Sequence, residues 1–400
     1  MREKYDVILI GAGIIGLATA YNLIKKNPGV KLCIIEKEDV IAKHQTGNNS
    51  GVIHSGIYYK PGSLKEQNCI RGYKMLLEFC NEHNIKYDIC GKLIVATNEH
   101  ELKALQILYD KGIQNGLQGL RIISREEAKE IEPYVNCVKA IHVPQTGIID
   151  YSNVTEKIFD ILYKHGVNIK LKEKLKDVDE DSNCVTVITD KDDYECKIFV
   201  SCAGLQSDRI AKLTNNKLDV RIIPFRGEYF NIKEHKRYLV NHLIYPVPDP
   251  QFPFLGVHFT RMIDGNVEAG PNAVLAMKRE GYGKLDMNIK DMKDTFTWSG
   301  FYHITWKHWQ TGIYEFYRSL MKYEFVNSLQ KLIPDITGKD LVPGGSGVRA
   351  QAVDKHGNLI DDFLFAEDKR IINVLNAPSP AATSSLSVGD TISDKIISRL

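Results

Sequence analysis

The first sixteen residues constrain this chain more than any other segment. An apolar, β-branched run at residues 5–10 leads directly into the glycine-rich sequence of residues 11–16. This order is typical of a buried parallel strand, a tight turn and a helix that begins beside a phosphate. Gly11 allows the turn, Gly13 lets the backbone approach a pyrophosphate, and Gly16 lets the helix pack against the strand. The pattern predicts a dinucleotide-binding fold.

Further strand patterns extend this prediction along the chain. Residues 32–35 are apolar and end at Glu36, about the spacing at which an acid bonds ribose hydroxyls. Residues 198–204 and 370–375 are two more apolar strands that end at turns of small residues. Because the turn at 203–204 lacks the spacing of a second glycine fingerprint, a bound flavin is favoured over a diffusing nicotinamide. Segments such as residues 221–233 have antiparallel character instead.

We therefore expect an α/β chain (α+β overall), in which a discontinuous Rossmann-like FAD-binding domain carries an inserted substrate domain built on a mixed or antiparallel sheet. The predicted boundaries are 1–80, 148–220 and 340–400 for the FAD-binding domain, and 81–147 and 221–339 for the substrate-binding domain.

Composition excludes several classes of protein. With 43% hydrophobic residues, 26% charged residues and a net charge of +2, the chain is typical of a globular protein, and we expect no nucleic-acid partner. No apolar run approaches the roughly 20 residues that span a bilayer. The eight cysteines form no C-x-x-C pair, which argues against zinc or a dithiol centre and for reduced thiols. Since the first strand follows Met1 almost at once, we expect no signal peptide and a cytoplasmic protein.

Residues 44–59 are too rich in glycine and small polar side chains for a core element. A loop of this kind can lie along an extended cofactor, with its N–H groups toward phosphate and ring oxygens. His54 stands among small residues that leave room for a substrate. A histidine near its ordinary pKa can accept a hydroxyl proton at neutral pH, so we predict a catalytic base; the alternative is a structural histidine.

Five stretches in order carry a resemblance to a known family. They are residues 44–64, 245–260, 270–276, 347–351 and 376–386. Across essentially its whole length the chain resembles the D-amino-acid-oxidase superfamily of flavoproteins, and within it the L-2-hydroxyglutarate dehydrogenase/oxidase family. The resemblance implies FAD as cofactor and the oxidation of an L-2-hydroxy acid, chiefly L-2-hydroxyglutarate, to 2-oxoglutarate. It also aligns His54 with the histidine that acts as base in related enzymes that oxidise hydroxyl groups.

The same resemblance implies a set of cofactor-binding residues. Those at the pyrophosphate and ribose come first in the chain, and those at the isoalloxazine come last. The set is Gly11, Gly13, Gly16, Glu36, Lys37, Thr46, Gly47, Asn49, Ser50, Gly51, Ala203, Gly204, Gly347, Gln351, Ser379, Ala381, Ala382, Thr383 and Ser384.

A small-molecule 2-hydroxy dicarboxylate needs two cationic or strongly donating anchors. Arginine suits this role because its planar fork pairs with a carboxylate through two bonds. Arg349, between Gly347 and a small Ala350, is the first candidate and Arg226 the second; the alternative for each is an ion pair. Further donors in the family-like stretches are Tyr58, Tyr245, His258 and Asn272.

All three tryptophans lie in residues 298–309, among other aromatics, lysines and arginines. Such a mixture can form an interfacial helix. We therefore consider a peripheral membrane contact through residues 296–318 at the inner face of a membrane; the alternative is that these aromatics cover the substrate domain or a subunit contact. Oxygen and quinone both remain as electron acceptors.

Two alternatives to a hydroxyglutarate enzyme stay open. A glycerol-3-phosphate oxidase or dehydrogenase of the same superfamily shares a loop like residues 49–54, but binds a phosphate in place of a second carboxylate. A flavin-bearing subunit without catalysis is the other, and His54 in a loop that a substrate can reach argues against it.

Overall fold

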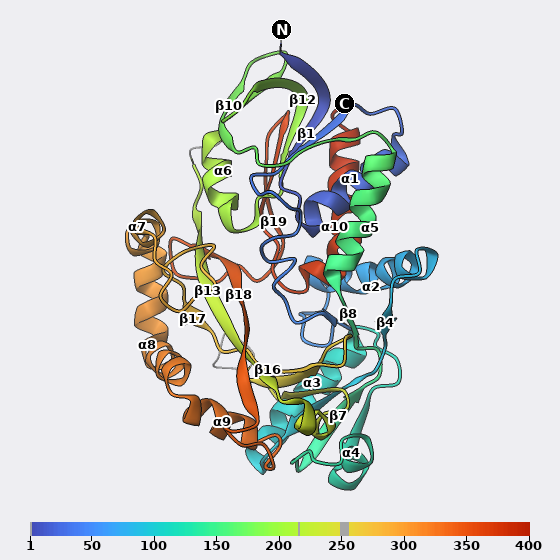
Figure 1. The fold of residues 1–400 in the computed structure, drawn as a ribbon, viewed down its shortest axis with the longest axis vertical. Helices are drawn as coiled ribbons and strands as arrows, with labels where there is room; N and C mark the ends of the chain where they lie inside the picture. The colour runs from blue at the N-terminus through green and yellow to red at the C-terminus, as the bar shows by residue number, and fades with distance from the viewer. Residues whose placement is uncertain (1, 215–216, 249–255) are drawn as a thin grey trace.

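The computed structural model describes residues 2–214, 217–248 and 256–400. Residues 249–255, which belong to the family-like stretch 245–260, lie outside the described part. The described elements form two large sheets, one in the upper and one in the lower half of Figure 1. Both termini lie at the upper end, so the chain leaves the upper half and returns to it.

The upper sheet contains the strands that the sequence predicts for a nucleotide fold. Its members are β1 (Glu3–Ile10), β2 (Leu32–Ile35), β9 (Asn168–Lys170), β10 (Leu175–Glu180), β11 (Val185–Thr189), β12 (Asp193–Ser201), β19 (Leu364–Glu367) and β20 (Ile371–Asn376). β1 pairs in parallel with β2 on one side and with β12 on the other, and β12 pairs in parallel with β20. The carboxyl ends of these parallel strands therefore meet at one edge, where open α/β sheets bind ligands.

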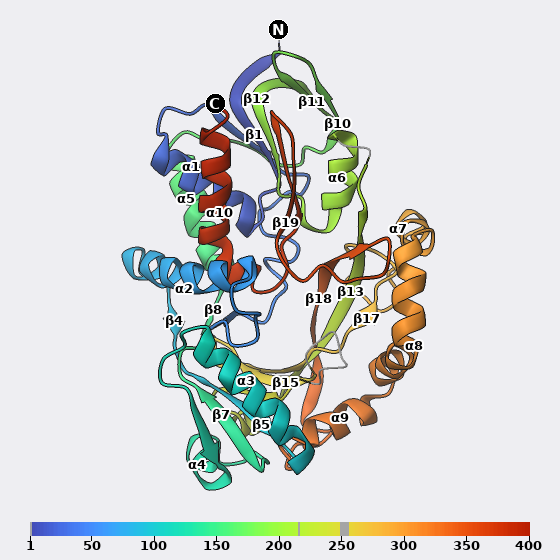
Figure 2. The ribbon, with the colours of Figure 1, turned by 180° about the vertical axis from the view of Figure 1, so that it is seen from behind.

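Helices cover both faces of the upper sheet. They are α1 (Ile14–Lys26), α2 (Leu64–Glu82), α5 (Tyr151–Lys164), α6 (Ser207–Thr214) and α10 (Ala381–Ile397). α1, α5 and α10 lie together on one face, whereas α6 lies on the other (Figures 1 and 2). The core between α1, α10 and the sheet is apolar and includes Leu9, Leu17 and Val200, all fully buried. This burial holds the segment after β1 against the segment after β20.

Glycine is required twice in the turn after β1. Gly11 has a φ of +103°, and a Cβ there would lie 2.6 Å from the carbonyl oxygen of Cys202. A Cβ on Gly16 would lie 2.0 Å from the carbonyl oxygen of Gly11. The first glycine is therefore demanded by backbone conformation and the second by close helix–turn packing.

The lower sheet is mixed. Its strands are β5 (Lys92–Ala96), β6 (Arg121–Ser124), β7 (Lys139–Val143), β13 (Val220–Ile232), β14 (Leu243–Pro246), β15 (His258–Arg261), β16 (Val267–Gly270), β17 (Val274–Leu275) and β18 (Leu341–Asp354). Only the β14–β5 pair is parallel among the described pairs. A third, small sheet joins the halves and consists of β3 (Val52–Ile53), β4 (Tyr87–Asp88) and β8 (Gly147–Ile149).

β18 corrects one predicted boundary. Residues 340–354 are placed in the FAD-binding domain by the sequence, but β18 pairs with β13 from Val220↔Asp354 to Ile232↔Leu341. Two glycines and a proline near its start have low strand propensity, so the sequence does not predict a strand here. The strand forms because it pairs along its length with β13. The lower sheet therefore extends to Asp354, and the chain rejoins the upper sheet only at β19.

The remaining helices lie around the lower sheet. They are α3 (Leu102–Gln114), α4 (Arg125–Ile131), α7 (Ile289–Phe296), α8 (Ser299–Leu320) and α9 (Lys322–Gln330). α7, α8 and α9 form an outer arm, orange at the left of Figure 1 and at the right of Figure 2. α8 bends at His308, which has a non-helical φ of −127°. Within the described ranges, no helix combines the length and apolarity that crossing a membrane requires.

Candidate active site

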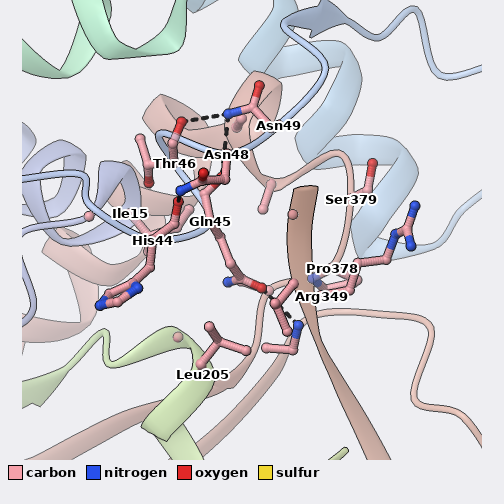
Figure 3. Close-up of a pocket in the computed structure, with 18 of the residues that line it drawn as sticks. Ile15, His44, Gln45, Thr46, Asn48, Asn49, Leu205, Arg349, Pro378 and Ser379 are labelled. Atoms are coloured by element: carbon pink, nitrogen blue, oxygen red, sulfur yellow. Dashed lines mark hydrogen bonds between the residues drawn. The ribbon is translucent and has the colours of Figure 1, made fainter. Parts of the chain in front are cut away.

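A cavity of about 1150 Å³ lies between the upper and lower sheets. It is lined by the turn after β1, by the 42–54 loop, by the start of α10 and by residues 347–351 of β18. Figure 3 shows these segments converging from the two halves of the chain. The volume exceeds that of most small-molecule pockets, about 300–1,000 Å³, and suits an extended ligand together with a second, smaller one.

One end of the cavity has the chemistry of a nucleotide site. Gly11, Gly13 and Glu36 line it. The Glu36 carboxylate accepts a hydrogen bond from the Ala12 N–H at 2.8 Å, which fixes the acid beside the glycine turn. α1 begins there without an acidic residue in its first turn and without a side-chain cap from its N-cap residue. This end therefore presents the positive end of a helix and backbone donors to an anion.

Lys37 joins three segments beside this end. Its ammonium donates to Glu38 and to Glu280 (2.9 Å), and lies 3.2 Å from a ring nitrogen of His44. Burial opposes ionisation of Glu38, but hydrogen bonds from Lys37, Lys43 and His44 lower the pKa of Glu38 to about 2. Glu38, His44 and Glu280 are close enough to hold a metal ion, yet Lys37 already pairs with both carboxylates and Lys43 pairs with Glu38 at 2.9 Å. The ion pair between Lys37 and Glu280 therefore holds the loop that carries Glu280 against the cavity.

The middle of the cavity is formed by the 42–54 loop, β18 and α10. The Gln45 Oε1 accepts from the Ala350 N–H at 2.8 Å and so joins the loop to β18 (Figure 3). Ser379, Ala381 and Ala382 line the cavity where α10 begins, again without an acid in the first turn. A second helix N-terminus whose N-cap side chain makes no capping bond therefore opens onto the cavity, suited to carbonyl or anionic oxygens.

The other end of the cavity brings together five residues predicted for substrate chemistry: His54, Tyr58, Tyr245, His258 and Arg349. The His54 N–H donates to Thr383 Oγ1 at 3.1 Å, which fixes the loop against α10. His258 Nδ1 lies 2.9 Å from the Gly256 carbonyl oxygen, and its ring stacks on Tyr245 at 3.8 Å. Since a carbonyl only accepts, Nδ1 of His258 carries the proton and Nε2 keeps a free lone pair.

Both histidines are neutral in this structure. Burial, with the positive charges of Lys92 and Lys65, lowers the pKa of His54 to about 3. Burial likewise lowers the pKa of His258 to about 3. The expectation that His54 has a pKa near its ordinary value is therefore wrong, because desolvation penalises the imidazolium. A neutral imidazole can still accept a proton, and an anionic ligand nearby raises its pKa again.

Two predicted substrate ligands lie outside the cavity lining. Arg226 is buried and paired with Glu228, with its Nη2 2.8 Å from the carboxylate and its Nη1 2.8 Å from the Gly283 carbonyl. Asn272 accepts from the Glu228 N–H at 2.8 Å and donates to the same carboxylate at 3.2 Å. Both side chains therefore help to satisfy the buried charge of Glu228, and the structure does not bring either of them to the cavity lining.

The predicted cofactor residues divide in the same way. Those that line the cavity are Gly11, Gly13, Glu36, Lys37, Thr46, Asn49, Ser50, Ala203, Gly204, Gly347, Gln351, Ser379, Ala381 and Ala382. Those outside its lining are Gly16, Gly47, Gly51, Thr383 and Ser384. Two of them support the lining from behind: Gly16 packs on the turn, and Thr383 Oγ1 accepts from the His54 backbone N–H and bonds the Tyr151 hydroxyl at 2.8 Å.

Sequence inspection missed several lining residues, among them Gln45, Tyr59, Lys65, Lys111 and Tyr229. Gln45 lies in the loop of residues 44–59 that the sequence predicts to line the cofactor, so its place in the cavity could have been predicted. Lys65 and Lys111 lie on helices whose amphipathic patterns resemble any surface helix. Only the packing of α2 and α3 against the cavity shows their place.

Comparison with known proteins agrees with this geometry. The DAO family, described as FAD dependent oxidoreductase, matches residues 6–395, and the chain belongs to this class of FAD-binding oxidoreductases. An L-2-hydroxyglutarate dehydrogenase of Indibacter alkaliphilus is 52% identical over 99% of both chains. The mitochondrial L-2-hydroxyglutarate dehydrogenase of Homo sapiens is 44% identical over 99% of this chain and 89% of its own length. Within the class, the chain is a member of the L-2-hydroxyglutarate dehydrogenase family.

Solved structures show the same fold. The FAD-bound L-alpha-glycerophosphate oxidase of Mycoplasma pneumoniae aligns with a TM-score of 0.80 at 22% identity, over 99% of this chain and 95% of its own. Glycine oxidase of Geobacillus kaustophilus aligns with a TM-score of 0.74 at 16% identity, over 100% and 96%. The α/β architecture with its mixed second sheet is thus that of FAD-dependent oxidoreductases.

Proposed function

We propose that this chain oxidises L-2-hydroxyglutarate to 2-oxoglutarate. The observation that carries the proposal is the substrate end of the cavity, where a neutral histidine and an arginine face the same space from opposite halves of the chain. The family membership and the activity named for its 52% identical relative support the same substrate. The nucleotide end and the two helix N-termini suit the diphosphate and ring oxygens of FAD.

His54 takes the proton of the substrate hydroxyl while the hydride leaves C2, so that C2 becomes a carbonyl carbon. When bound, FAD supplies the two-electron acceptor for that hydride. Arg349 pairs with a substrate carboxylate and orients C2. The carboxylates stabilise the imidazolium that forms on His54 and offset the desolvation that otherwise lowers its pKa. His258, whose Nε2 lone pair also faces this region, is the second candidate for the base.

Anaerobic mixing tests the activity directly. The purified yellow protein is mixed with L-2-hydroxyglutarate, its D enantiomer or glycerol 3-phosphate, and flavin absorbance near 450 nm is followed. Bleaching by the L-hydroxy acid alone supports the proposal. Bleaching by glycerol 3-phosphate alone would replace it with a phosphate-ester oxidase, and no bleaching by any hydroxy acid would favour a subunit without catalysis.

We also propose that the outer arm touches a membrane and that electrons pass to a quinone. The arm's outer surface is defined here as the exposed apolar residues of α8, of the first turn of α7 and of the loop before α7, and these side chains project to solvent. Trp306 is 86% exposed, Ile289 86% and Leu285 90%. Exposed lysines such as Lys290 and Lys307 lie among these side chains. Aromatic and apolar side chains bordered by lysines suit an anionic lipid surface.

Vesicle sedimentation tests this contact. We expect the protein to sediment with vesicles that contain anionic lipid, and the W306S/W309S double variant to lose most of that binding. Tyr163, 71% exposed on α5, provides the matched control Y163S. A protein that ignores all vesicles but forms a dimer dispersed by W306S/W309S would assign the surface to a subunit contact. The rate of oxygen consumption is compared with the rate of reduction of a soluble quinone, and the faster of the two identifies the preferred electron acceptor.

A further inference from the structure

Lys92 is a buried ammonium beneath the substrate end of the cavity. It lies in β5 and is only 2% exposed. In the register of β5 with β14, Lys92 is opposite Leu243 and Ile94 is opposite Tyr245. Paired residues share a face of the sheet and alternate residues along a strand lie on the same face, so Lys92 shares its face with Tyr245, which lines the cavity.

Aromatic rings lie against this ammonium, and no carboxylate of the described residues pairs with it. Its Nζ lies 4.6 Å from the centre of the Tyr58 ring and 4.7 Å from that of Tyr245. None of the ion pairs or hydrogen bonds of the described residues joins a carboxylate to Lys92. A buried cation with no counter-ion is costly, and burial lowers the pKa of Lys92 to about 7. The ammonium form of Lys92 therefore lacks a negative partner among the described residues.

A dianionic ligand supplies that partner. Arg349 is one cation at the substrate end, whereas Arg226, the expected second cation, is neutralised by Glu228. Of the two lysines that line the cavity nearby, Lys65 pairs with Asp361 at 2.7 Å and Lys111 donates to the Tyr58 carbonyl oxygen at 3.5 Å. The Tyr58 hydroxyl is buried without a hydrogen-bond partner among the described residues. A ligand that brings a second carboxylate against Tyr58 and Tyr245 would lie over the Lys92 ammonium. It would then find a donor and a positive charge at a place where no carboxylate of the described residues pairs with the lysine.

We propose that Lys92 is the second cation of the substrate site: a positioning residue that favours dianionic over monoanionic 2-hydroxy and 2-oxo acids through Tyr58 and Tyr245. This inference rests on the proposed function for the identity of the substrate. Because a bound dianion favours the charged ammonium, binding above neutral pH is accompanied by uptake of a proton at Lys92.

Other groups around Lys92 determine which control the test needs. Burial raises the pKa of the Tyr58 hydroxyl and raises the pKa of the Cys69 thiol to about 12, so both stay neutral. Glu268, on the same sheet face in β16, has a pKa raised to about 7, first by burial and then by Asp264, and could also take up a proton. The described charged and titratable groups that face this region are His54, Tyr58, Lys65, Cys69, Lys111, Tyr229, Tyr245, His258, Glu268 and Arg349.

Calorimetry on the FAD-loaded, oxidised protein tests the proposal without turnover. 2-Oxoglutarate and pyruvate are titrated at pH 8 in two buffers of different ionisation enthalpy, which gives affinity and proton uptake together. We expect wild type and Glu268→Gln to take up most of one proton with 2-oxoglutarate. Lys92→Met should take up almost none and bind 2-oxoglutarate about tenfold more weakly, with pyruvate little changed. Lys129→Met, an exposed lysine of α4, is the matched control.

Three results would overturn the proposal: no proton uptake by wild type, uptake that persists in Lys92→Met, or uptake that disappears only in Glu268→Gln. If Lys92→Met fails to fold, Lys92→Arg, which keeps a charge, should retain the preference for 2-oxoglutarate over pyruvate. The proton uptake of the wild-type protein then remains the test, because its absence would overturn the proposal. Proton-linked binding of 2-oxoglutarate without bleaching by L-2-hydroxyglutarate would reject the proposed function alone.

Discussion

His54 reaches the cavity from a loop whose backbone, not its imidazole, is hydrogen-bonded to α10. The side chain can therefore be removed while the loop stays attached. We expect His54→Ala to keep the yellow flavin spectrum but to slow anaerobic flavin reduction by roughly 10²–10⁴-fold, the usual contribution of a general base. Stopped-flow absorbance at 450 nm measures the rate.

His258→Ala is the informative companion to this variant. If the large loss follows His258 while His54→Ala reduces its flavin at the wild-type rate, the base is His258, whose Nε2 lone pair is set by the bond to Gly256. His142→Ala, in β7 outside the cavity lining, controls for the loss of any histidine.

Arg349 tests the forked contact with a carboxylate. Arg349→Lys keeps the charge but offers a point donor in place of a planar pair. We expect it to raise the Kd for 2-oxoglutarate by about ten- to a hundredfold, or about 1.4–2.8 kcal/mol, and to change kcat less. Equal affinity in the two proteins, measured by flavin difference spectra, would place the carboxylate on another group.

At the residue scale, sequence patterns identify reactive side chains better than they identify their neighbours. Arg226 and Arg349 look alike in sequence, each beside a small residue. Only the structure shows that Glu228 takes the first, and that Lys92, an unremarked lysine at the start of an apolar strand, lies under the substrate end. The charge state of His54 was also inaccessible, because it depends on burial by segments far along the chain.

At the scale of elements, local patterns predicted what local chemistry determines. The strand, turn and helix over residues 5–26 follow from apolar periodicity and glycine spacing, and they form as β1 and α1. β18 was not predicted as a strand of the second sheet, because its glycine-rich start has weak strand propensity and its formation depends on β13. Long-range pairing, not local preference, decides that element.

The Lys37 cluster should govern how long FAD stays bound. Glu280 comes from a loop of the second domain and holds Lys37 and Gln206 at 2.9 and 2.8 Å beside the nucleotide end. We expect Glu280→Gln to speed FAD dissociation by about tenfold, because it removes a charge-assisted bond that closes the loop over the cavity. Flavin fluorescence recovery after dilution measures the rate, and Glu324→Gln on α9 is a control. An unchanged rate would make the cluster merely structural.

Asp390 links α10 to two other helices and makes their packing sensitive to pH. Its carboxylate pairs with Lys26 of α1 at 2.7 Å and with Arg71 of α2. Burial opposes ionisation, but these cations lower the pKa of Asp390 below its ordinary value. A depressed folded-state pKa stabilises the protein above the unfolded value, near 3.9, and this stabilisation is lost as pH falls through the folded pKa.

Asp390→Asn should therefore lower the free energy of unfolding by about 1 kcal/mol at pH 7, a modest loss because Lys26 keeps its pair with Asp394 at 2.6 Å and the Arg71 side chain is 56% exposed. The difference from wild type should shrink as pH falls below about 4. Urea midpoints of the FAD-loaded proteins at pH 7 and pH 3.5 provide the comparison. A difference that stays constant with pH would show that the ion pairs contribute nothing.

At the scale of the whole molecule, the cavity belongs to neither half alone. Gly11, Glu36 and His54 come from segments packed on the upper sheet, whereas Tyr245 and Arg349 come from the lower one. A ligand that fills the cavity thus contacts both halves and couples their stability. Each half has its own apolar core. The coupling between their stabilities therefore depends on the contacts between the halves and on the ligand in the cavity.

FAD should therefore make the two halves unfold together. Ligand that binds only the folded state stabilises it by about 2.7 kcal/mol at 100 times its Kd, which raises the midpoint by several degrees. All three tryptophans lie in residues 298–309 of the outer arm, so their fluorescence reports the lower half, while flavin fluorescence reports the cavity. We expect both signals to change at one temperature with excess FAD. After FAD removal, the tryptophan transition should move to lower temperature, and Glu280→Gln should show a smaller shift. A tryptophan transition that ignores FAD would show that the halves unfold independently and that the cofactor stabilises only the upper one.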